Sequence, residues 1–269
     1  MMQFVRHYLL ALQFFTRVPV TGRLADWVGY SPEMLRRSAA HFPGVGWLVG
    51  GLAAGVYAGL AMVLPDGGYT PLLLAVLSTV FTVRLTGAFH EDGLADVADG
   101  LGGSYDRERA LDIMKDSRVG AYGALALVLA LLLKVSLLAV LGEADPALAC
   151  GALFFAHVLS RFTPLWLIRL LPHVGDTARS KSKPLADQIS GAGLCVAALW
   201  TAAAVALAGW WLPDARLWLG GGLAAVLAWL WMWRYLARRL QGYTGDCLGA
   251  TQQVGEIAIY FGLAVALTL

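Results

Sequence analysis

The sequence predicts an all-α fold: a polytopic, membrane-embedded bundle of about seven transmembrane helices plus an N-terminal interfacial helix. Of the 269 residues, 58% are hydrophobic and only 14% are charged, whereas about 25% are charged in soluble domains. Seven runs approach the roughly 20 apolar residues that cross a bilayer core, at 42–64, 70–89, 119–141, 146–171, 190–212, 216–236 and 250–269. We expect one transmembrane domain over residues 1–269, and the net charge of +2 gives no indication of nucleic-acid binding.

The segment before the first span is short and mixed in character. Phe4, Tyr8, Leu12 and Phe15 recur at helical spacing. An amphipathic helix of this kind lies in the plane of the membrane surface, so we expect residues 2–15 to be interfacial rather than spanning.

The connections between the spans differ in charge. Arginine and lysine concentrate in four of them, whereas the alternate connections hold mainly Asp66, Glu143, Asp145 and Asp214. Basic connections stay on the cytoplasmic side of a membrane, so the pattern predicts a cytoplasmic N-terminus and an outside C-terminus. The four connections predicted to form a cytoplasm-facing active site are 16–41, 90–118, 172–189 and 237–249.

An acidic cluster follows the second span. On a helix Asp92, Asp96 and Asp99 fall within roughly 60° of one another, and Glu91 points about 100° away. Carboxylates about 6 Å apart repel by about 3 kcal/mol per pair at an effective dielectric of about 20, so such a row favours a bound cation, and oxygen ligands favour Mg²⁺ or Mn²⁺. Gly93 and Gly100 leave backbone room for a phosphate. The alternative is a solvated helix face.

Two further segments carry candidate phosphate-binding groups. Lys115 and Arg118 precede the third span and could clamp phosphate oxygens, although anchoring at the cytoplasmic surface explains them equally well. Gly245 opens the last span, where backbone N–H groups can bind an anion, and Asp246 adds a possible metal ligand.

Some charged residues fall inside the predicted spans. Arg161 lies in mid-span and is a candidate to face substrate, because a charge in the bilayer is costly without a role. Lys134 and Glu256 have no evident partner in the sequence. His90 adjoins the acids, although an interfacial histidine at a helix end is an equally simple account.

The chain resembles the cobalamin synthase (adenosylcobinamide-GDP ribazoletransferase) family almost from end to end. Three segments carry the resemblance most specifically, and two early elements add to it. Gln241-Gly242 stands where a Gly-Gly pair is expected, a departure that concerns local loop geometry. The matching segments are 87–100, 113–120 and 242–250, with 14–20 and 41–46.

The resemblance implies the reaction that joins the two halves of vitamin B12. A ribose hydroxyl of α-ribazole, or of its 5′-phosphate, would attack the phosphate that bears cobinamide in adenosylcobinamide-GDP, releasing GMP. The resemblance also implies a Mg²⁺-dependent enzyme that lies in the bacterial inner membrane and is surrounded by lipid. Assembly as a homo-oligomer is possible under this interpretation. We expect the metal ligands to be Asp92, Asp96, Asp99 and Asp246.

The remaining roles follow from the same implied chemistry. Lys115 and Arg118 would stabilise charge on the departing GMP, and Asp116 or His90 would accept the proton of the attacking hydroxyl. Gly93, Gly100, Arg161 and Gly245 would contact substrate.

Two other functions compete with this interpretation. A CDP-alcohol phosphotransferase also uses an Asp-Gly opening, but it places further aspartates well downstream, whereas Asp96 and Asp99 follow Asp92 closely. A cation-coupled transporter predicts ligands near the bilayer midplane, whereas these acids lie at the end of a span.

Overall fold

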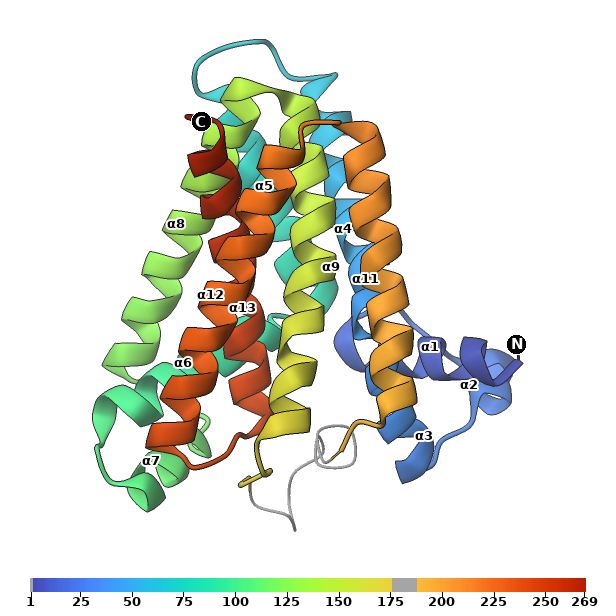
Figure 1. Ribbon diagram of the computed structural model, residues 1–269, viewed down its shortest axis with the longest axis vertical. Coiled ribbons are helices and arrows are strands. Elements are labelled where there is room, and N and C mark those ends of the chain that lie inside the picture. Colours follow the sequence, from blue (N-terminus) through green and yellow to red (C-terminus); the bar gives the residue numbers. More distant parts are fainter. Residues whose placement is uncertain (1, 176–187) are drawn as a thin grey trace.

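The computed structural model describes residues 2–175 and 188–269, and the predicted all-α bundle is confirmed there. Seven long helices form the bundle in the described part of the chain (Figure 1): α4 (Phe42–Ala61), α5 (Thr70–Thr86), α8 (Ala121–Ala144), α9 (Pro146–Leu170), α11 (Gly191–Trp211), α12 (Ala215–Arg239) and α13 (Gly245–Ala266). The shorter helices are α1 (Met2–Phe15), α2 (Gly22–Val28), α3 (Pro32–Ser38), the 3₁₀ helix η1 (Ala39–His41), α6 (Phe89–Gly103) and α7 (Arg107–Met114).

Each predicted span corresponds to one long helix, but not every helix is apolar enough to cross a membrane by itself. Five of the described helices are, or six if α5 and α6 form one broken span with an 89° bend. The shortfall in α13 has a local cause, because its buried residues include Gln252, Gln253 and Glu256. These polar groups face protein rather than lipid.

The helix ends are fixed by the capping residues that the sequence places there. Asp145 and Ser190 accept hydrogen bonds from the first turns of α9 and α11, and Thr244 accepts one from Cys247 in α13. Each side chain satisfies a backbone N–H that has no partner inside its own helix. Gly87 and Ala88 both adopt left-handed φ values, 68° and 60°, and this pair produces the bend between α5 and α6.

The polar connections gather at one end of the bundle (Figure 1). Helices α2, α3, α6 and α7 lie toward the lower end of that view, whereas the α4–α5, α8–α9 and α11–α12 connections lie at the upper end. This agrees with the predicted alternation, but segments 90–118 and 237–249 are largely helical rather than loops. Most of 172–189, including Arg179, Lys181 and Lys183, lies outside the described residues.

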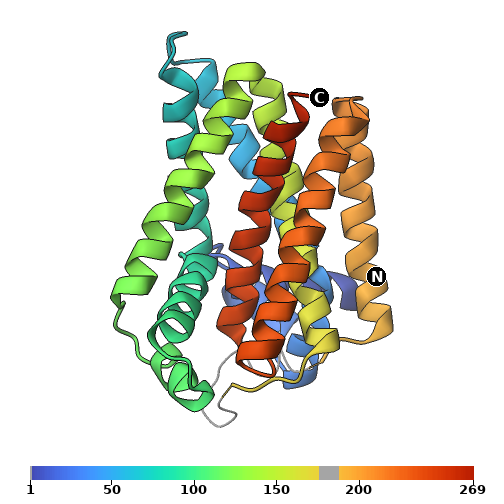
Figure 2. The same cartoon turned by 60° about the vertical axis from the view of Figure 1, so that its left-hand side comes forward.

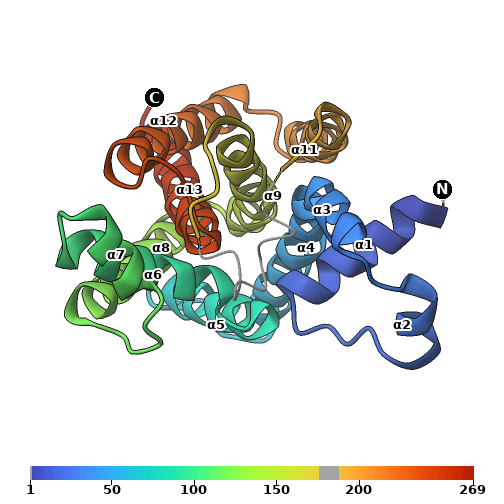
Figure 3. The ribbon, with the colours of Figure 1, turned by 90° about the horizontal axis from the view of Figure 1, so that it is seen from below.

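Helix α1 crosses the direction of the bundle instead of joining it (Figure 3). Its residues Leu10, Ala11, Leu12 and Phe15 are buried, and the Phe15 ring packs edge-on against Phe42 at 4.1 Å between centroids. Residues 2–5 at its start and Gln13 are exposed, and the helix lies across the bundle as an interfacial helix does.

Helices α9 and α13 form the interior of the bundle. Helix α9 is the most buried of the candidate spans, and α12 and α13 lie side by side along their lengths (Figure 2). Glycines permit this approach: a Cβ on Gly220 would meet the Gly262 carbonyl oxygen at 2.7 Å. Tight packing through small residues is the usual basis of helix association in membranes.

Candidate active site

Helix α6 is set against the lower end of the bundle by the bend at residues 87–88. It packs on α13, α8 and α7. At 15 residues it is too short to cross a bilayer core of about 30 Å, so we place it outside the spans.

Two carboxylates on α6 have no hydrogen-bond or ion-pair partner in the part of the chain that the structure describes. Asp92 is exposed and Asp96 is half-buried, and neither side chain is bonded to another described residue. Asp246 lies across from them at the start of α13, with one hydrogen bond from the Thr244 hydroxyl at 3.2 Å. Burial, followed by the negative charges of Asp246, Asp92 and Asp99, raises the pKa of Asp96 to about 7. The site therefore concentrates carboxyl groups that no cation among the described residues neutralises.

Asp99 is the third member of the predicted row, and it is engaged differently. One carboxylate oxygen accepts a hydrogen bond from the Gly120 N–H at 2.7 Å, and the other accepts one from the Gly123 N–H at 2.8 Å. The carboxylate thus sits at the N-terminus of α8, where the helix dipole favours an anion. This contact gives Asp99 an anchoring function between α6 and α8; its role as a metal ligand stays a prediction.

The prediction for Gly93 and Gly100, two of the glycines of α6, needs correction, because protein fills the space beside them. A Cβ on Gly93 would meet the Asp246 carbonyl oxygen at 2.7 Å, and one on Gly100 would meet the Met114 side chain at 2.5 Å. Both glycines allow close helix packing, so the structure does not leave the room for phosphate that the sequence suggested.

The described residues contain no group of three or more His, Cys, Asp or Glu side chains arranged to hold a metal ion. The carboxylates of Asp92, Asp96 and Asp246 interact electrostatically but do not form a closed set of ligands. Such an arrangement suits Mg²⁺ better than zinc, because Mg²⁺ is commonly held by one or two carboxylates and completed by substrate phosphates and water.

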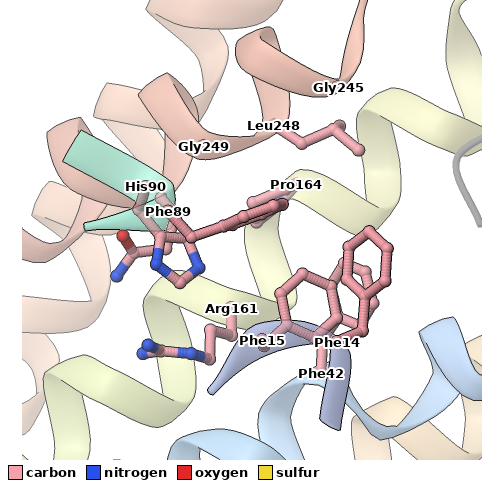
Figure 4. A pocket seen from close by; sticks show the side chains of 11 residues that line it. Phe14, Phe15, Phe42, Phe89, His90, Arg161, Pro164, Gly245, Leu248 and Gly249 are labelled. Carbon is pink, nitrogen blue, oxygen red and sulfur yellow. The ribbon is translucent and has the colours of Figure 1, made fainter. Parts of the chain in front are cut away.

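His90, Arg161 and Gly245 line one narrow pocket (Figure 4). Phe14, Phe15, Phe42 and Phe89 supply much of its apolar wall. Arg161 is 3% exposed, and its Nη1 donates to the His157 carbonyl oxygen at 2.9 Å, whereas its Nε has no hydrogen-bond partner among the described residues. The structure thus joins three predicted residues into one cavity that offers a buried cation.

The predicted phosphate clamp is arranged quite differently. Arg118 pairs with Asp116 at 2.6 Å, and Lys115 lies 3.4 Å from Asp112. The Arg118 side chain is 87% exposed, and its guanidinium lowers the pKa of the Asp116 carboxyl to about 2. A carboxylate with so low a pKa is a weak base, which argues against Asp116 as the proton acceptor.

The main feature that the sequence interpretation missed is a buried polar network. Lys134 and Glu256 are ion-paired at 2.6 Å with side chains 2% and 1% exposed. Gln252 and Tyr260 donate to the same carboxylate. Their spacing of four residues on either side of Glu256 was the available signal, because it places all three on one face of α13.

Comparison with known proteins identifies the relatives of this chain. The family model described as "Cobalamin-5-phosphate synthase" matches residues 7–264. The chain belongs to this family. A Polaromonas naphthalenivorans protein named "Adenosylcobinamide-GDP ribazoletransferase" is 63% identical, covering 99% of this chain and 100% of the relative. Proteins of the same name from Albidiferax ferrireducens and Vibrio cholerae are 62% and 44% identical, over 99% and 94% of this chain and 100% and 91% of theirs.

No solved structure matches the chain. Family membership confirms the predicted resemblance and favours the ribazoletransferase interpretation over the phosphotransferase and transporter alternatives.

Proposed function

We propose that this chain transfers the adenosylcobinamide phosphate group of adenosylcobinamide-GDP to α-ribazole or its 5′-phosphate. GMP is released, and adenosylcobalamin or its 5′-phosphate is formed. The observation that carries the proposal is the group of free carboxylates on α6, opposite Asp246, in a chain that belongs to the cobalamin-5-phosphate synthase family over residues 7–264.

We propose Mg²⁺ as the cofactor. Asp92, Asp96 and Asp246 would hold it, because their oxygens are the ligand type that Mg²⁺ prefers and their mutual repulsion favours a cation between them. When bound, the ion supplies charge neutralisation and orientation for the diphosphate of the donor. These residues would hold Mg²⁺ in an open site, in which phosphate oxygens of the substrate supply the remaining ligands.

The chain's own groups would then place and polarise the reactants. A new P–O bond forms from the acceptor hydroxyl to the cobinamide-bearing phosphorus, and the bond from that phosphorus to the bridging oxygen of GMP breaks. Arg161 and the first amides of α13 at Gly245 are placed to neutralise phosphate charge. His90 in the same pocket is better placed than Asp116 to take the hydroxyl proton.

Lys115 and Arg118, which are paired with acids at the surface of segment 112–118, would act on the substrate from outside the pocket. Lys115 and Arg118 would attract the anionic donor and offset charge on departing GMP. Both side chains are exposed and already paired with acids. We therefore expect the loss of either one to lower the reaction rate less than the loss of Asp92 or Asp96 would.

We propose that the protein lies in the bacterial inner membrane with its N-terminus and active site toward the cytoplasm. The basic connections that the structure describes share one end of the bundle with the site, and basic segments remain on the cytoplasmic side. Lipid would surround the exposed apolar faces of α8 and α12, and assembly into a homo-oligomer stays a prediction.

The proposal is tested with purified protein in detergent, adenosylcobinamide-GDP, α-ribazole and Mg²⁺. We expect GMP and the joined corrinoid to appear in equal amounts, and chelation with EDTA to stop both. Folded protein that releases no GMP from this mixture would overturn the proposed reaction. Unchanged turnover in EDTA would overturn the proposed metal.

A further inference from the structure

A chain of hydrogen bonds leads from the acidic helix into the bundle. The Gln253 Nε2 donates to Glu91 Oε1 at 3.1 Å and also to Gln252 Oε1 at 2.9 Å. The Gln252 Nε2 in turn donates to Ser160 Oγ at 2.9 Å and to Glu256 Oε2 at 2.8 Å. Every one of these residues is buried. The chain therefore links α6 to α13 and α9 without passing through solvent.

The inner end of this chain is firmly held. Glu256 receives Lys134 from α8 at 2.6 Å and the Tyr260 hydroxyl at 3.1 Å. In a low-dielectric interior, hydrogen-bonded polar groups favour one arrangement of their helices, because a shift would leave further buried polar groups without partners. Arg161 adds positive charge that interacts with both Glu91 and Glu256.

The outer end of the chain lies where α6 and α13 come closest. A Cβ on Gly93 would meet the Asp246 carbonyl oxygen at 2.7 Å, and one on Gly249 would meet the His90 Cα at 3.3 Å. Glycines at this contact provide no side chains that interlock, so packing alone does not fix the position of α6 along α13. The Glu91–Gln253 bond is a polar contact that fixes the register of this junction.

Glu91 itself faces away from the free carboxylates. It precedes Asp92 by one residue, so its side chain points about 100° from that of Asp92. It is 7% exposed and contacts Gln253, whereas Asp92 is exposed. Its charge is directed into the bundle, toward Arg161.

We propose that Glu91 is a positioning residue that acts through Gln253. The bond between them fixes α6 on α13, so that Asp92 and Asp96 stay opposite Asp246, where the proposed Mg²⁺ would bind. The inference rests on the proposed metal site and extends it to a residue pair that touches neither metal nor substrate.

The test measures binding of Mn²⁺ alone to the purified full chain by EPR titration, with Gln253→Leu as the principal variant. This change removes the donor at similar volume and without altering charge. We expect the Kd for Mn²⁺ to rise at least about tenfold, and the Mg²⁺ concentration for half-maximal activity to rise by a larger factor than turnover falls. Thr251→Val is the matched control, because that buried α13 hydroxyl bonds only the Cys247 carbonyl oxygen of its own helix.

Two variants of Glu91 separate positioning from charge. Glu91→Gln keeps an oxygen that accepts from Gln253, and its Kd for Mn²⁺ should stay within about threefold of the wild type. Glu91→Ala should match Gln253→Leu, and the double variant should be no weaker than either single one. If Glu91→Gln loses as much affinity as Glu91→Ala, or if Gln253→Leu binds Mn²⁺ like the wild type, the positioning role is wrong.

Asp96→Asn distinguishes this failure from failure of the metal site. If Asp96→Asn removes Mn²⁺ binding while Gln253→Leu does not, only the positioning role is overturned. If Asp96→Asn binds Mn²⁺ normally, the metal site is overturned, and the positioning role falls with it.

Discussion

The junction of α6 with α13 and the segment of residues 112–118 both carry clustered charged residues, but ion pairs neutralise the charge only in segment 112–118. In segment 112–118 each cation is paired with a nearby acid on the surface. At the junction, Asp92, Asp96 and Asp246 lie near one another and have no cationic partner among the described residues, and burial together with the neighbouring carboxylates raises the pKa of Asp96. Surface pairs of the first kind contribute little energy, whereas uncompensated like charges favour an external ligand. We therefore expect the metal and the chemistry at the junction rather than at segment 112–118.

The junction also divides its acids by function. Glu91 and Asp99 contact protein, one through Gln253 on α13 and the other through the amides that open α8. Asp92 and Asp96, between them on the same helix, remain free. The helix is thus held on both sides of Asp92 and Asp96, and we expect these two carboxylates to face substrate.

The largest effect is expected from Asp96→Asn, which removes a charge at nearly constant volume. GMP release should fall by at least about 1,000-fold, because charge neutralisation on the transferred phosphate is the main catalytic contribution in such a site. The assay follows GMP in detergent with saturating Mg²⁺. Asp112→Asn is the matched control on exposed α7, and Asp96→Asn activity within about tenfold of the wild type would contradict the assignment.

The next effect concerns the anchor of the junction. Lys134→Met leaves Glu256 buried without its cation and should lower the free energy of unfolding by about 3–5 kcal/mol. Adding Glu256→Gln should recover much of that loss, since no buried charge of the pair then remains. Denaturant unfolding in detergent, followed by tryptophan fluorescence, measures both. A double variant as unstable as the sum of its singles would refute the pairing.

Asp99 should behave as a helix anchor. Asp99→Ala removes the acceptor for two amides at the start of α8, and we expect a loss of about 1–2 kcal/mol in the free energy of unfolding. Its activity, measured well below its unfolding temperature, should exceed that of Asp96→Asn. The opposite order of activities would show that Asp99 also belongs to the metal site.

Removing the surface ion pair between Arg118 and Asp116 should lower activity less than the changes above. Arg118→Ala should raise the KM for adenosylcobinamide-GDP by no more than about tenfold, because an exposed ion pair is screened by solvent and salt. The KM difference from the wild type should shrink as NaCl is raised. If the turnover rate at saturating substrate instead drops by about two orders of magnitude, segment 112–118 belongs to the reaction centre.

The smallest effect is expected from Asp116→Asn. Its folded pKa of about 2 lies below the ordinary value of 3.8, so this carboxylate favours folding at pH values above 3.8 and loses that contribution as the pH falls toward 2. It stays ionised across any neutral assay range. The acidic limb of the activity profile between about pH 5 and 8 should therefore be unchanged, and a clear shift would restore Asp116 as a proton acceptor.

The bundle could be predicted closely because its signals are local. Hydrophobic runs, capping residues such as Ser190, and alternating charge in the connections act over a few residues each, and they set the helix positions. The acidic row was equally local, since Asp92 and Asp96 lie one turn apart on any helix.

What escaped prediction depends on contacts between distant segments. Lys134 and Glu256 pair across more than 100 positions, and no single-sequence pattern specifies which helix faces which. The same is true of Asp99, whose partners are backbone amides rather than identifiable side chains. Gly93 was misinterpreted for a related reason: a glycine that admits a phosphate and one that admits a neighbouring helix look identical in sequence.

The most direct test of the central claim is to locate the metal. Crystals of the protein grown with Mn²⁺ and adenosylcobinamide-GDP, without acceptor, would be measured at the manganese absorption edge. We predict an anomalous peak between Asp96 and Asp246, in contact with the diphosphate of the donor. A peak beside residues 112–118, or ordered donor with no manganese at the junction, would contradict it.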